Sequence, residues 1–264
     1  MLVVVLSLLG GIVKILGGLL YGSKALFVDA MTCIANFVAL TATIYYYKAS
    51  LIPPDEDHHF GHHRLGYGGA IVSLLAYSFV AGIVVFDLLA TREYNVEIYA
   101  PLFATIGFLL YFCVIFLSRK ISSFFGPYSV FTVSELIEST TVIIASLAGA
   151  LYSYLIDFGG AIILTTYLFY EIYGVTKDLL YHLSDIAPSK TLLDDIKKTI
   201  ESYNVRLKKL RVRMVSPGVY YGEATIQVPR DLTVDKLEEL ITMITRKVKE
   251  EHRVELLVTI ETRK

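Results

Sequence analysis

The hydrophobic residues of this chain are concentrated before Leu183, where they form long windows separated by short polar stretches. Six of these windows hold about the ~20 residues that a helix needs to cross a ~30 Å hydrocarbon layer. We therefore predict six membrane-spanning helices, at Leu2–Tyr21, Ala25–Tyr47, Gly68–Leu89, Tyr99–Leu117, Val133–Ile156 and Ala161–Leu180. The first window continues through "GGLLYGSK" into the second, so we interpret it as a retained helix and not as a cleaved signal.

After Pro188 the pattern changes to that of a water-soluble domain. Apolar residues at helical spacing follow Ser189, a predicted N-cap, in "SKTLLDDIKKTIESY". Two alternating segments, "VRLKKLRVRMV" and "YYGEATIQV", flank the turn "SPGV" and predict a pair of strands. A second helix, "TVDKLEELITMITRKVKEE", and a last strand, "RVELLVTIET", complete the order αββαβ. We predict a six-helix membrane domain at 1–183 and an α+β domain at 184–264.

The distribution of basic residues orients the predicted helices. Lys48, Arg64, Arg119 and Lys120 flank the loops after the second and fourth windows, and Lys177 leads into a tail that holds most of the remaining Lys and Arg. By the positive-inside rule, both termini face the cytoplasm. The net charge of −1 provides no large basic surface, so we expect no nucleic-acid partner. No nucleophile–base pair or phosphate loop is visible, and we expect no enzymatic activity.

Two of the apolar windows carry polar side chains at intervals of three or four residues. With 3.6 residues per turn, such residues share one face of a helix, so the two helices can aim oxygen ligands at each other. Ionisable groups within a membrane usually face the bundle interior and indicate function. The residues are Asp29, Thr32, Cys33 and Asn36 in the second window, and Glu135, Glu138 and Ser139 in the fifth.

These polar groups differ in how strongly they indicate an ion site. Thr32, Asn36 and Ser139 either bind an ion or hydrogen-bond neighbouring helices, and both readings stay open. A buried acid must instead take up a proton or find a cation, which makes Glu135 the strongest candidate. Glu138 lies either in the site or nearer the cytoplasmic end, in contact with water.

Other charged residues in the windows are interpreted as structural. We expect Lys14 to pair with a carboxylate. Asp87 and Glu171 lie near the ends of windows, where we expect solvated or interfacial side chains. Asp157 opens "DFGGA" and is expected in a turn at the outer end of the fifth helix.

The loop "PPDEDHHFGHHRLGYGG" after the second window concentrates ligand-type side chains. It holds four of the six histidines of the chain beside three acids. Imidazole and carboxylate together suit zinc and its transition-metal neighbours. The alternative is a hydrated polar loop, and we favour metal binding. The candidates are Asp55, Glu56, Asp57, His58, His59, His62 and His63.

Several motifs resemble those of the cation diffusion facilitators, a family of zinc, iron and manganese efflux transporters. "GSKALFVDA" is similar to the family's GS-x-AL-x-x-D-A, and "PPDEDHHFGHHR" to its P-D-x-x-H-x-[FY]-G-H. "SELIESTTVIIASLAG" resembles its S-D-x-x-x-S segment, and "LSDIAP" resembles the L-L-D-x-[AS]-P that precedes its tail. The resemblance covers nearly the whole chain and implies six membrane helices with a ferredoxin-like cytoplasmic domain, usually dimeric.

The resemblance also implies the positions of the transport ligands. The family takes two residues four apart from each of helices two and five, commonly [HD]-x-x-x-D. These positions fall here on Thr32 and Asn36, and on Phe131 and Glu135. Asp29 matches an acid one turn before the ligand pair, which in the family is not normally itself a ligand, and we include it as an additional candidate ligand. Because Glu135 is the only acid at the four positions, we expect an oxygen-rich site harder than a tetrahedral zinc site.

Outside the transport site, the resemblance distinguishes the loop from the tail. Asp55, His58 and His62 fall where the family places interfacial metal ligands, and we expect a structural zinc there. In the tail, Thr259 stands where a ligand histidine is often found. We therefore expect the tail to dimerise without a full binuclear metal centre.

Together with these features, the resemblance implies a multi-pass homodimer of the cell membrane. We expect it to export a divalent metal cation, such as zinc, manganese or iron, in exchange for protons by alternating access. The competing interpretation is a non-transporting scaffold or metal sensor that binds metal only at the loop, and it is favoured by Thr32 and Phe131.

Overall fold

The computed structural model describes residues 2–121, 126–216 and 218–262. Within these ranges, the side chains of residues 2–4, 7, 115, 117–121 and 126–134 fall outside the description. The predictions that rest on the side chains of Arg119, Lys120 and Phe131 therefore lie outside the described residues.

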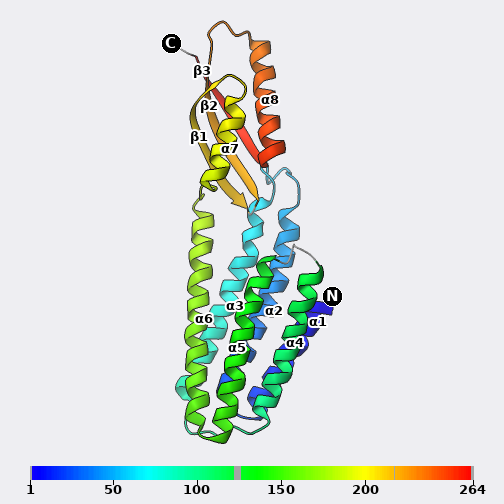
Figure 1. Ribbon diagram of the computed structural model, residues 1–264, viewed down its shortest axis with the longest axis vertical. Helices are drawn as coiled ribbons and strands as arrows, with labels where there is room; N and C mark the ends of the chain where they lie inside the picture. The colour runs from blue at the N-terminus through cyan, green and yellow to red at the C-terminus, as the bar shows by residue number, and fades with distance from the viewer. Residues whose placement is uncertain (1, 122–125, 217, 263–264) are drawn as a thin grey trace. The chain divides into compact units, whose positions relative to one another are not determined.

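Six long helices form the first part of the described chain, and each overlaps one predicted window. They are α1 (Leu2–Leu20), α2 (Lys24–Ser50), α3 (Gly68–Ala90), α4 (Ala100–Ile121), α5 (Gly126–Leu151) and α6 (Tyr154–Leu183). Figure 1 shows them as a bundle of elongated, side-by-side helices. In the described residues, α2, α6 and the segment His63–Ala90, which joins the short helix η1 (His63–Tyr67) to α3, are long and apolar enough to cross a membrane. Shorter apolar stretches lie in α1 and α4.

Small side chains allow the helices to pack closely. Buried alanines from five helices meet in the core: Ala25, Ala81, Ala104, Ala145 and Ala161. A Cβ added at Gly18 of α1 would lie 2.9 Å from the Cα of Phe27 in α2. Glycine at this position therefore lets the two backbones approach, as small residues do between membrane helices.

The boundary between α5 and α6 differs from the predicted one. The chain turns at Tyr152–Ser153, and Asp157 lies inside the first turn of α6. Its carboxylate is fully buried and accepts hydrogen bonds from Ser23 Oγ at 2.6 Å and from the Lys24 backbone N–H at 2.7 Å. The expectation that Asp157 lies in a turn was wrong, because this acid stabilises the start of α2, a contact that local sequence does not reveal.

The chain after α6 forms one sheet with two helices, which confirms the predicted order αββαβ. The elements are α7 (Lys190–Glu201), β1 (Arg206–Ser216), β2 (Val219–Val228), α8 (Val234–His252) and β3 (Val254–Thr262). The strand order is β1-β2-β3, with β1 antiparallel and β3 parallel to β2. Ser189 caps α7 by accepting a hydrogen bond from the Leu192 N–H, as predicted. Ile200 of α7 and Ile244 of α8 pack with Ile226 in one core.

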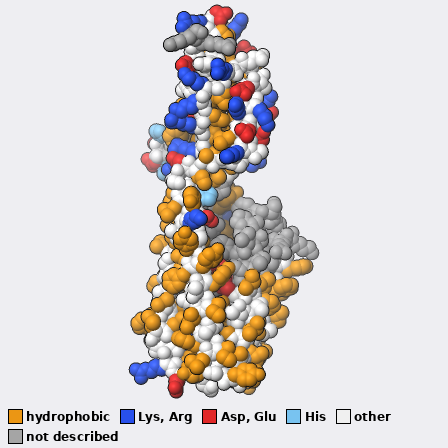
Figure 2. Space-filling view, turned by 60° about the vertical axis from the view of Figure 1, so that its left-hand side comes forward, with side chains coloured by type: hydrophobic (Ala, Val, Ile, Leu, Met, Phe, Trp, Pro, Cys, Tyr) orange, Lys and Arg blue, Asp and Glu red, His pale blue; other side chains and the backbone are white. Residues whose placement is uncertain are grey.

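Contacts divide the chain into two units that interleave along the sequence. One unit comprises Met1–Tyr45 and Gly69–Thr176, and the other comprises Tyr46–Gly68 and Lys177–Lys264. The loop after α2 thus belongs to the unit that holds the sheet, and the domain division at residue 183 stays a prediction. Figure 2 shows hydrophobic side chains spread over the helical unit, and acidic and basic side chains over the sheet unit. These surfaces suit lipid and water, respectively.

Candidate metal centres

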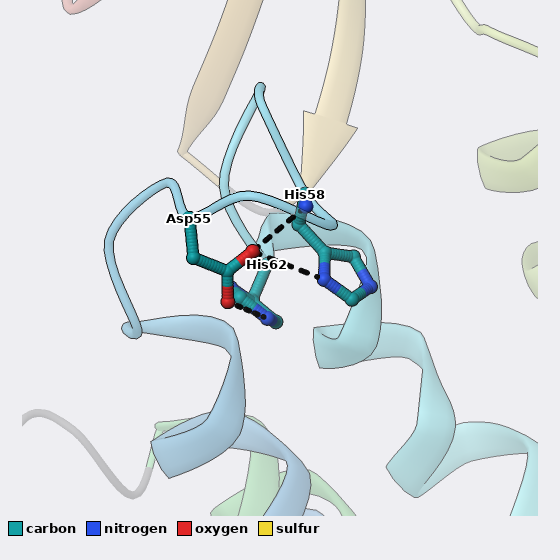
Figure 3. A group of neighbouring side chains, drawn as sticks. All are labelled: Asp55, His58 and His62. Atoms are coloured by element: carbon teal, nitrogen blue, oxygen red, sulfur yellow. Dashed lines mark hydrogen bonds and ion pairs between the residues drawn. The ribbon is translucent and has the colours of Figure 1, made fainter.

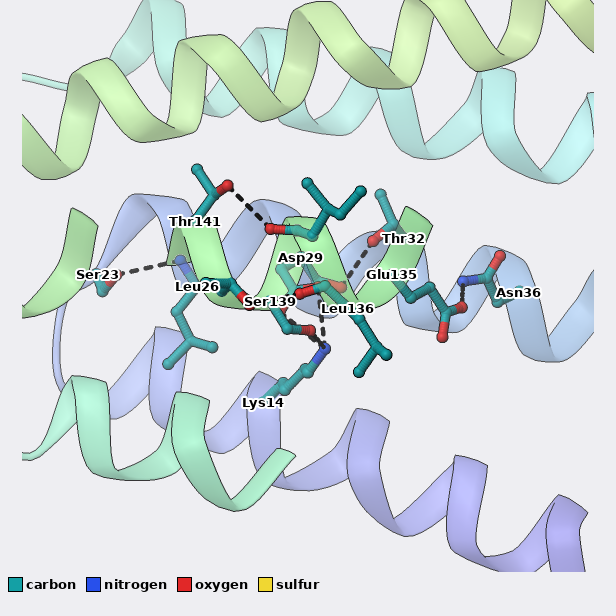
Figure 4. Close-up of polar contacts among 12 residues, drawn as sticks. Lys14, Ser23, Leu26, Asp29, Thr32, Asn36, Glu135, Leu136, Ser139 and Thr141 are labelled. Atoms are coloured by element: carbon teal, nitrogen blue, oxygen red, sulfur yellow. Dashed lines mark hydrogen bonds and ion pairs between the residues drawn. The ribbon is translucent and has the colours of Figure 1, made fainter. Parts of the chain in front are cut away.

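The first candidate centre joins α2, α3 and α5. The Asn36 side-chain amide in α2 donates a hydrogen bond to Oε1 of Glu135 in α5, as Figure 4 shows. The side-chain carbonyl of Asn36 accepts a hydrogen bond from the hydroxyl of Tyr77 in α3. Glu135 is 7% exposed, and its Oε2 atom has no hydrogen-bond partner among the described residues. Such a buried carboxylate oxygen needs a cation or a proton.

Thr32 lies one turn from Asn36 along α2 and is also buried. Its hydroxyl donates to the backbone carbonyl of Asp29 at 2.8 Å. A hydroxyl that donates one hydrogen bond still has oxygen lone pairs for a ligand. Thr32 therefore keeps the capacity to contribute an oxygen beside Asn36.

The carboxylate of Asp29 is held by a lysine. Nζ of Lys14 in α1 lies 3.0 Å from Oδ1 and 2.9 Å from Oδ2, and donates to Oγ of Ser139 in α5 at 2.8 Å. Oδ2 makes no hydrogen bond among the described residues, yet it is paired with the ammonium, because the strength of an ion pair depends on distance more than on direction. The exposed fractions are 0% for Lys14 and 2% for Asp29. The prediction that Lys14 pairs with a carboxylate is confirmed.

Glu138 follows Glu135 by one turn of α5. It is buried, so the alternative that placed it in contact with water was wrong. It interacts electrostatically with Glu171 of α6 and with Glu135, so three carboxyl groups gather in this part of the bundle. The fourth position implied by the resemblance, Phe131, lies outside the described side chains.

The second candidate centre lies in the loop after α2. Asp55, His58 and His62 each place a ligand atom within 4.8 Å of the others. Figure 3 shows the three side chains converging, with the Asp55 carboxylate beside both rings. His58 Nδ1 and His62 Nε2 lie 3.4 Å from different oxygens of Asp55. Among the described residues, His59 and His63 are not part of this cluster.

The geometry of this triad fits a transition metal. Two ligands about 2.1 Å from a tetrahedral ion are separated by about 3.4 Å. Each histidine lies at this distance from one oxygen of Asp55, although not from the same oxygen, and one ligand atom from each residue lies within 4.8 Å of the others. The His62 side chain is buried, and its Nδ1 has no hydrogen-bond partner among the described residues. The backbone N–H of His58 donates to Oδ1 of Asp55 at 2.7 Å and lowers the pKa of this carboxyl below its ordinary value. Asp55 is therefore an anionic ligand at neutral pH.

Contacts within the sheet unit hold the loop in place. The Tyr221 hydroxyl of β2 donates to the carbonyl of Phe60 at 3.0 Å, and the two rings meet edge to face. Asp185 accepts hydrogen bonds from Arg64 and Arg213, each at 2.9 Å. These contacts fix the loop on both sides of His62.

Comparison with known proteins agrees with this architecture. The family profile described as "Cation efflux transmembrane domain" matches residues 1–184, and that described as "Cation efflux protein, cytoplasmic domain" matches residues 188–262. The chain belongs to the cation diffusion facilitator family. The manganese efflux system protein MneS of Bacillus subtilis (strain 168) is 24% identical to this cation diffusion facilitator over 258 residues, which cover 92% of this chain and 87% of that protein.

Family membership makes this chain a multi-pass membrane protein of a cation efflux class.

One participant in the first centre, Tyr77, was missed by the sequence reasoning. A tyrosine inside an apolar window is a weak signal, because the chain holds 19 tyrosines and such rings also anchor helices at membrane interfaces.

Proposed function

We propose that this cation diffusion facilitator exports a divalent cation and binds it between α2 and α5. The observation that carries the proposal is the buried Glu135 carboxylate, which contacts Asn36 through one oxygen and has no partner among the described residues at the other. Thr32 is the third proposed ligand. Asp29 lies one turn before Thr32 on α2, and its backbone carbonyl accepts the hydrogen bond of the Thr32 hydroxyl. Phe131, at the fourth family position, supplies no ligand atom.

Manganese is the cation that we favour. Carboxylate, amide and hydroxyl oxygens suit hard cations, of which Mn²⁺ is the transition-metal example, whereas zinc favours nitrogen and sulfur. The relative MneS is named as a manganese efflux protein. Both arguments rank Mn²⁺ above Zn²⁺ for this chain.

Proton exchange supplies the driving force in this proposal. A bound cation favours the ionised form of Glu135, and its departure leaves a buried carboxylate that gains by taking up a proton. Alternating access would then couple export of the cation to entry of protons. We further propose a homodimer with both termini in the cytoplasm and a zinc ion at Asp55, His58 and His62 that stabilises the loop.

The test is cation flux into proteoliposomes under an imposed pH gradient, with Mn²⁺, Zn²⁺, Fe²⁺, Co²⁺, Mg²⁺ and Ca²⁺ compared. We expect Glu135→Gln to reduce Mn²⁺ flux at least about tenfold, because the only acid among the ligand positions is lost. Glu97→Gln, at an exposed position between α3 and α4, is the matched control and should transport normally. Proton-coupled flux that is unchanged in Glu135→Gln would show the proposed site to be wrong.

A second function is favoured by a separate observation. Among the described residues, the loop triad is the group of acids and histidines that brings three ligand atoms together. A non-transporting scaffold or metal sensor would use this triad while the altered membrane site moves no ions. Absence of flux for all six cations, with metal binding that depends on His58 and His62, would select this function.

A further inference from the structure

We propose that Lys14 keeps Asp29 out of the cation's ligand set and thereby sets the strength and specificity of cation binding. The inference rests on the proposed function, because it concerns the same site between α2 and α5. Lys14 acts on the transported ion through Asp29, so it is a positioning and specificity-determining residue and not a ligand.

The helices around Lys14 form a built site for an ammonium group. Its Nζ contacts Asp29 of α2 and Ser139 of α5, and lies 4.6 Å from the ring centre of Tyr111 in α4. A Cβ at Gly107 of α4 would lie 2.6 Å from Cγ of Lys14, so the absence of a side chain there makes room for the lysine stem. Figure 4 shows Lys14 reaching from α1 toward Asp29 and Ser139.

The ammonium occupies the place that a cation would need in order to use Asp29. Both Asp29 oxygens lie within 3.0 Å of Nζ, and an ammonium and a metal ion cannot share them without strong repulsion. Lys14 also interacts electrostatically with Glu135. A cation at Glu135 is therefore attracted by its ligand and repelled by the neighbouring lysine.

The formal charges of these three residues predict the effect of each substitution. With Glu135 ionised, wild type has a sum of −1, because Lys14 and Asp29 cancel. Lys14→Met keeps an unbranched stem in the slot beside Gly107, frees a carboxylate and gives −2. Asp29→Asn leaves the ammonium without its acid and gives 0. The double variant removes the pair and returns the sum to −1.

The test is Mn²⁺ binding to the purified full-length protein, measured from the electron paramagnetic resonance signal of free Mn²⁺. Binding to Glu135→Gln is subtracted as binding outside the site. We expect Lys14→Met to bind at least about tenfold tighter, Asp29→Asn at least about tenfold weaker, and the double variant within about threefold of wild type. Competition with Mg²⁺ on the same samples reports specificity, and Lys14→Met should lose discrimination between the two ions.

The outcomes separate this inference from the proposed function. Binding that is unchanged in Glu135→Gln overturns the site and the inference together. If Glu135→Gln loses binding but the double variant binds about tenfold weaker than wild type, Asp29 is a ligand and the inference alone is wrong. Wild-type affinity in Lys14→Met would overturn it as well. If a single variant does not fold, the double variant still tests whether Asp29 is a ligand, because removing both charges leaves neither member of the pair as an unpaired buried ion.

Discussion

Ser23 Oγ, at the start of α2, donates a hydrogen bond to Oδ1 of Asp157 in α6 at 2.6 Å across 134 residues of sequence. Oδ2 of the same carboxylate accepts from the backbone N–H of Lys24 and from the hydroxyl of Tyr94. Asp157 thus supplies, from another helix, the acceptors that the first turn of α2 lacks. An anionic acceptor at a helix N-terminus is also favoured by the helix dipole.

We therefore expect Asp157→Ala to destabilise the helical unit by about 2–3 kcal/mol, because buried donors lose their acceptor. Thermal unfolding in detergent measures the change. The control is Asp87→Asn, which weakens the partly exposed Lys24–Asp87 pair and should cost about 1 kcal/mol or less. Equal losses in the two variants would contradict the capping role of Asp157.

A second prediction concerns the approach of α1 to α2. Gly18→Ala places a methyl group 2.9 Å from backbone atoms of Phe27, which must move, so we expect a loss of about 1–3 kcal/mol. Gly82→Ala in α3 is the matched control, because a Cβ there meets nothing within 4 Å. That control should be neutral or slightly stabilising, since alanine favours helix more than glycine does. The same unfolding measurement distinguishes them.

The loop triad yields a third prediction. We expect His62→Ala to lower bound zinc by about one ion per chain, because a three-residue site loses its buried imidazole. His59→Ala, an exposed neighbour outside the triad, should leave bound zinc unchanged. Metal analysis after equilibrium dialysis of the full chain measures both. Parallel loss in the two variants would mean that the loop binds zinc without the triad geometry.

The pair of Lys249 and Glu255 makes the stability of the sheet unit depend on pH. Lys249 Nζ donates a hydrogen bond to Oε1 of Glu255 at 2.9 Å. This hydrogen bond is the main reason that the pKa of Glu255 lies below its ordinary value of 4.5. A lowered pKa in the folded state stabilises the fold above the ordinary value, and this contribution is lost as the pH falls through the folded value. Because both side chains are at least half exposed, we expect a contribution below about 1 kcal/mol.

Calorimetry of the full chain and of Lys249→Met tests this pH dependence. The variant should have the lower Tm at pH 7, and the two values should converge as the pH falls through the lowered pKa of Glu255, where Glu255 becomes protonated in both. A Tm difference that stays constant down to pH about 3 would mean that Lys249 stabilises the unit through packing and not through charge.

Local pattern predicted most of the fold. Period-two and helical spacing placed β1, β2, β3, α7 and α8 in the right order, and Ser189 was predicted as the cap of α7. The boundary between α5 and α6 was predicted too late in the sequence, because the apolar pattern continues across Tyr152–Ser153 and the polar Asp157 was taken to mark the turn. The hydrogen-bond partners of Asp157 lie far away in sequence, so no local signal could place its side chain.

The candidate site was predictable only in part. Helical spacing aligned Thr32 and Asn36 on α2, and the cost of a buried acid pointed to Glu135. We expected Lys14 to pair with a carboxylate because a buried charge without a partner is costly. Which carboxylate it meets, Asp29, depends on how α1 packs against α2. Tyr77 enters through a hydrogen bond to Asn36 that only the arrangement of α2 and α3 creates.

The contact between Ser23 and Asp157 also has a consequence for the order of assembly during synthesis. At about 5–20 residues per second, the 134 residues that separate the two take on the order of ten seconds to translate. Until then, the first turn of α2 has Ser23 as its own cap, since Ser23 Oγ accepts from the Leu26 N–H at 3.1 Å. The hydrogen bonds from the start of α2 to Asp157 can therefore form only after α1 to α5 have been synthesised. They join α6 to α2 at a late step of assembly.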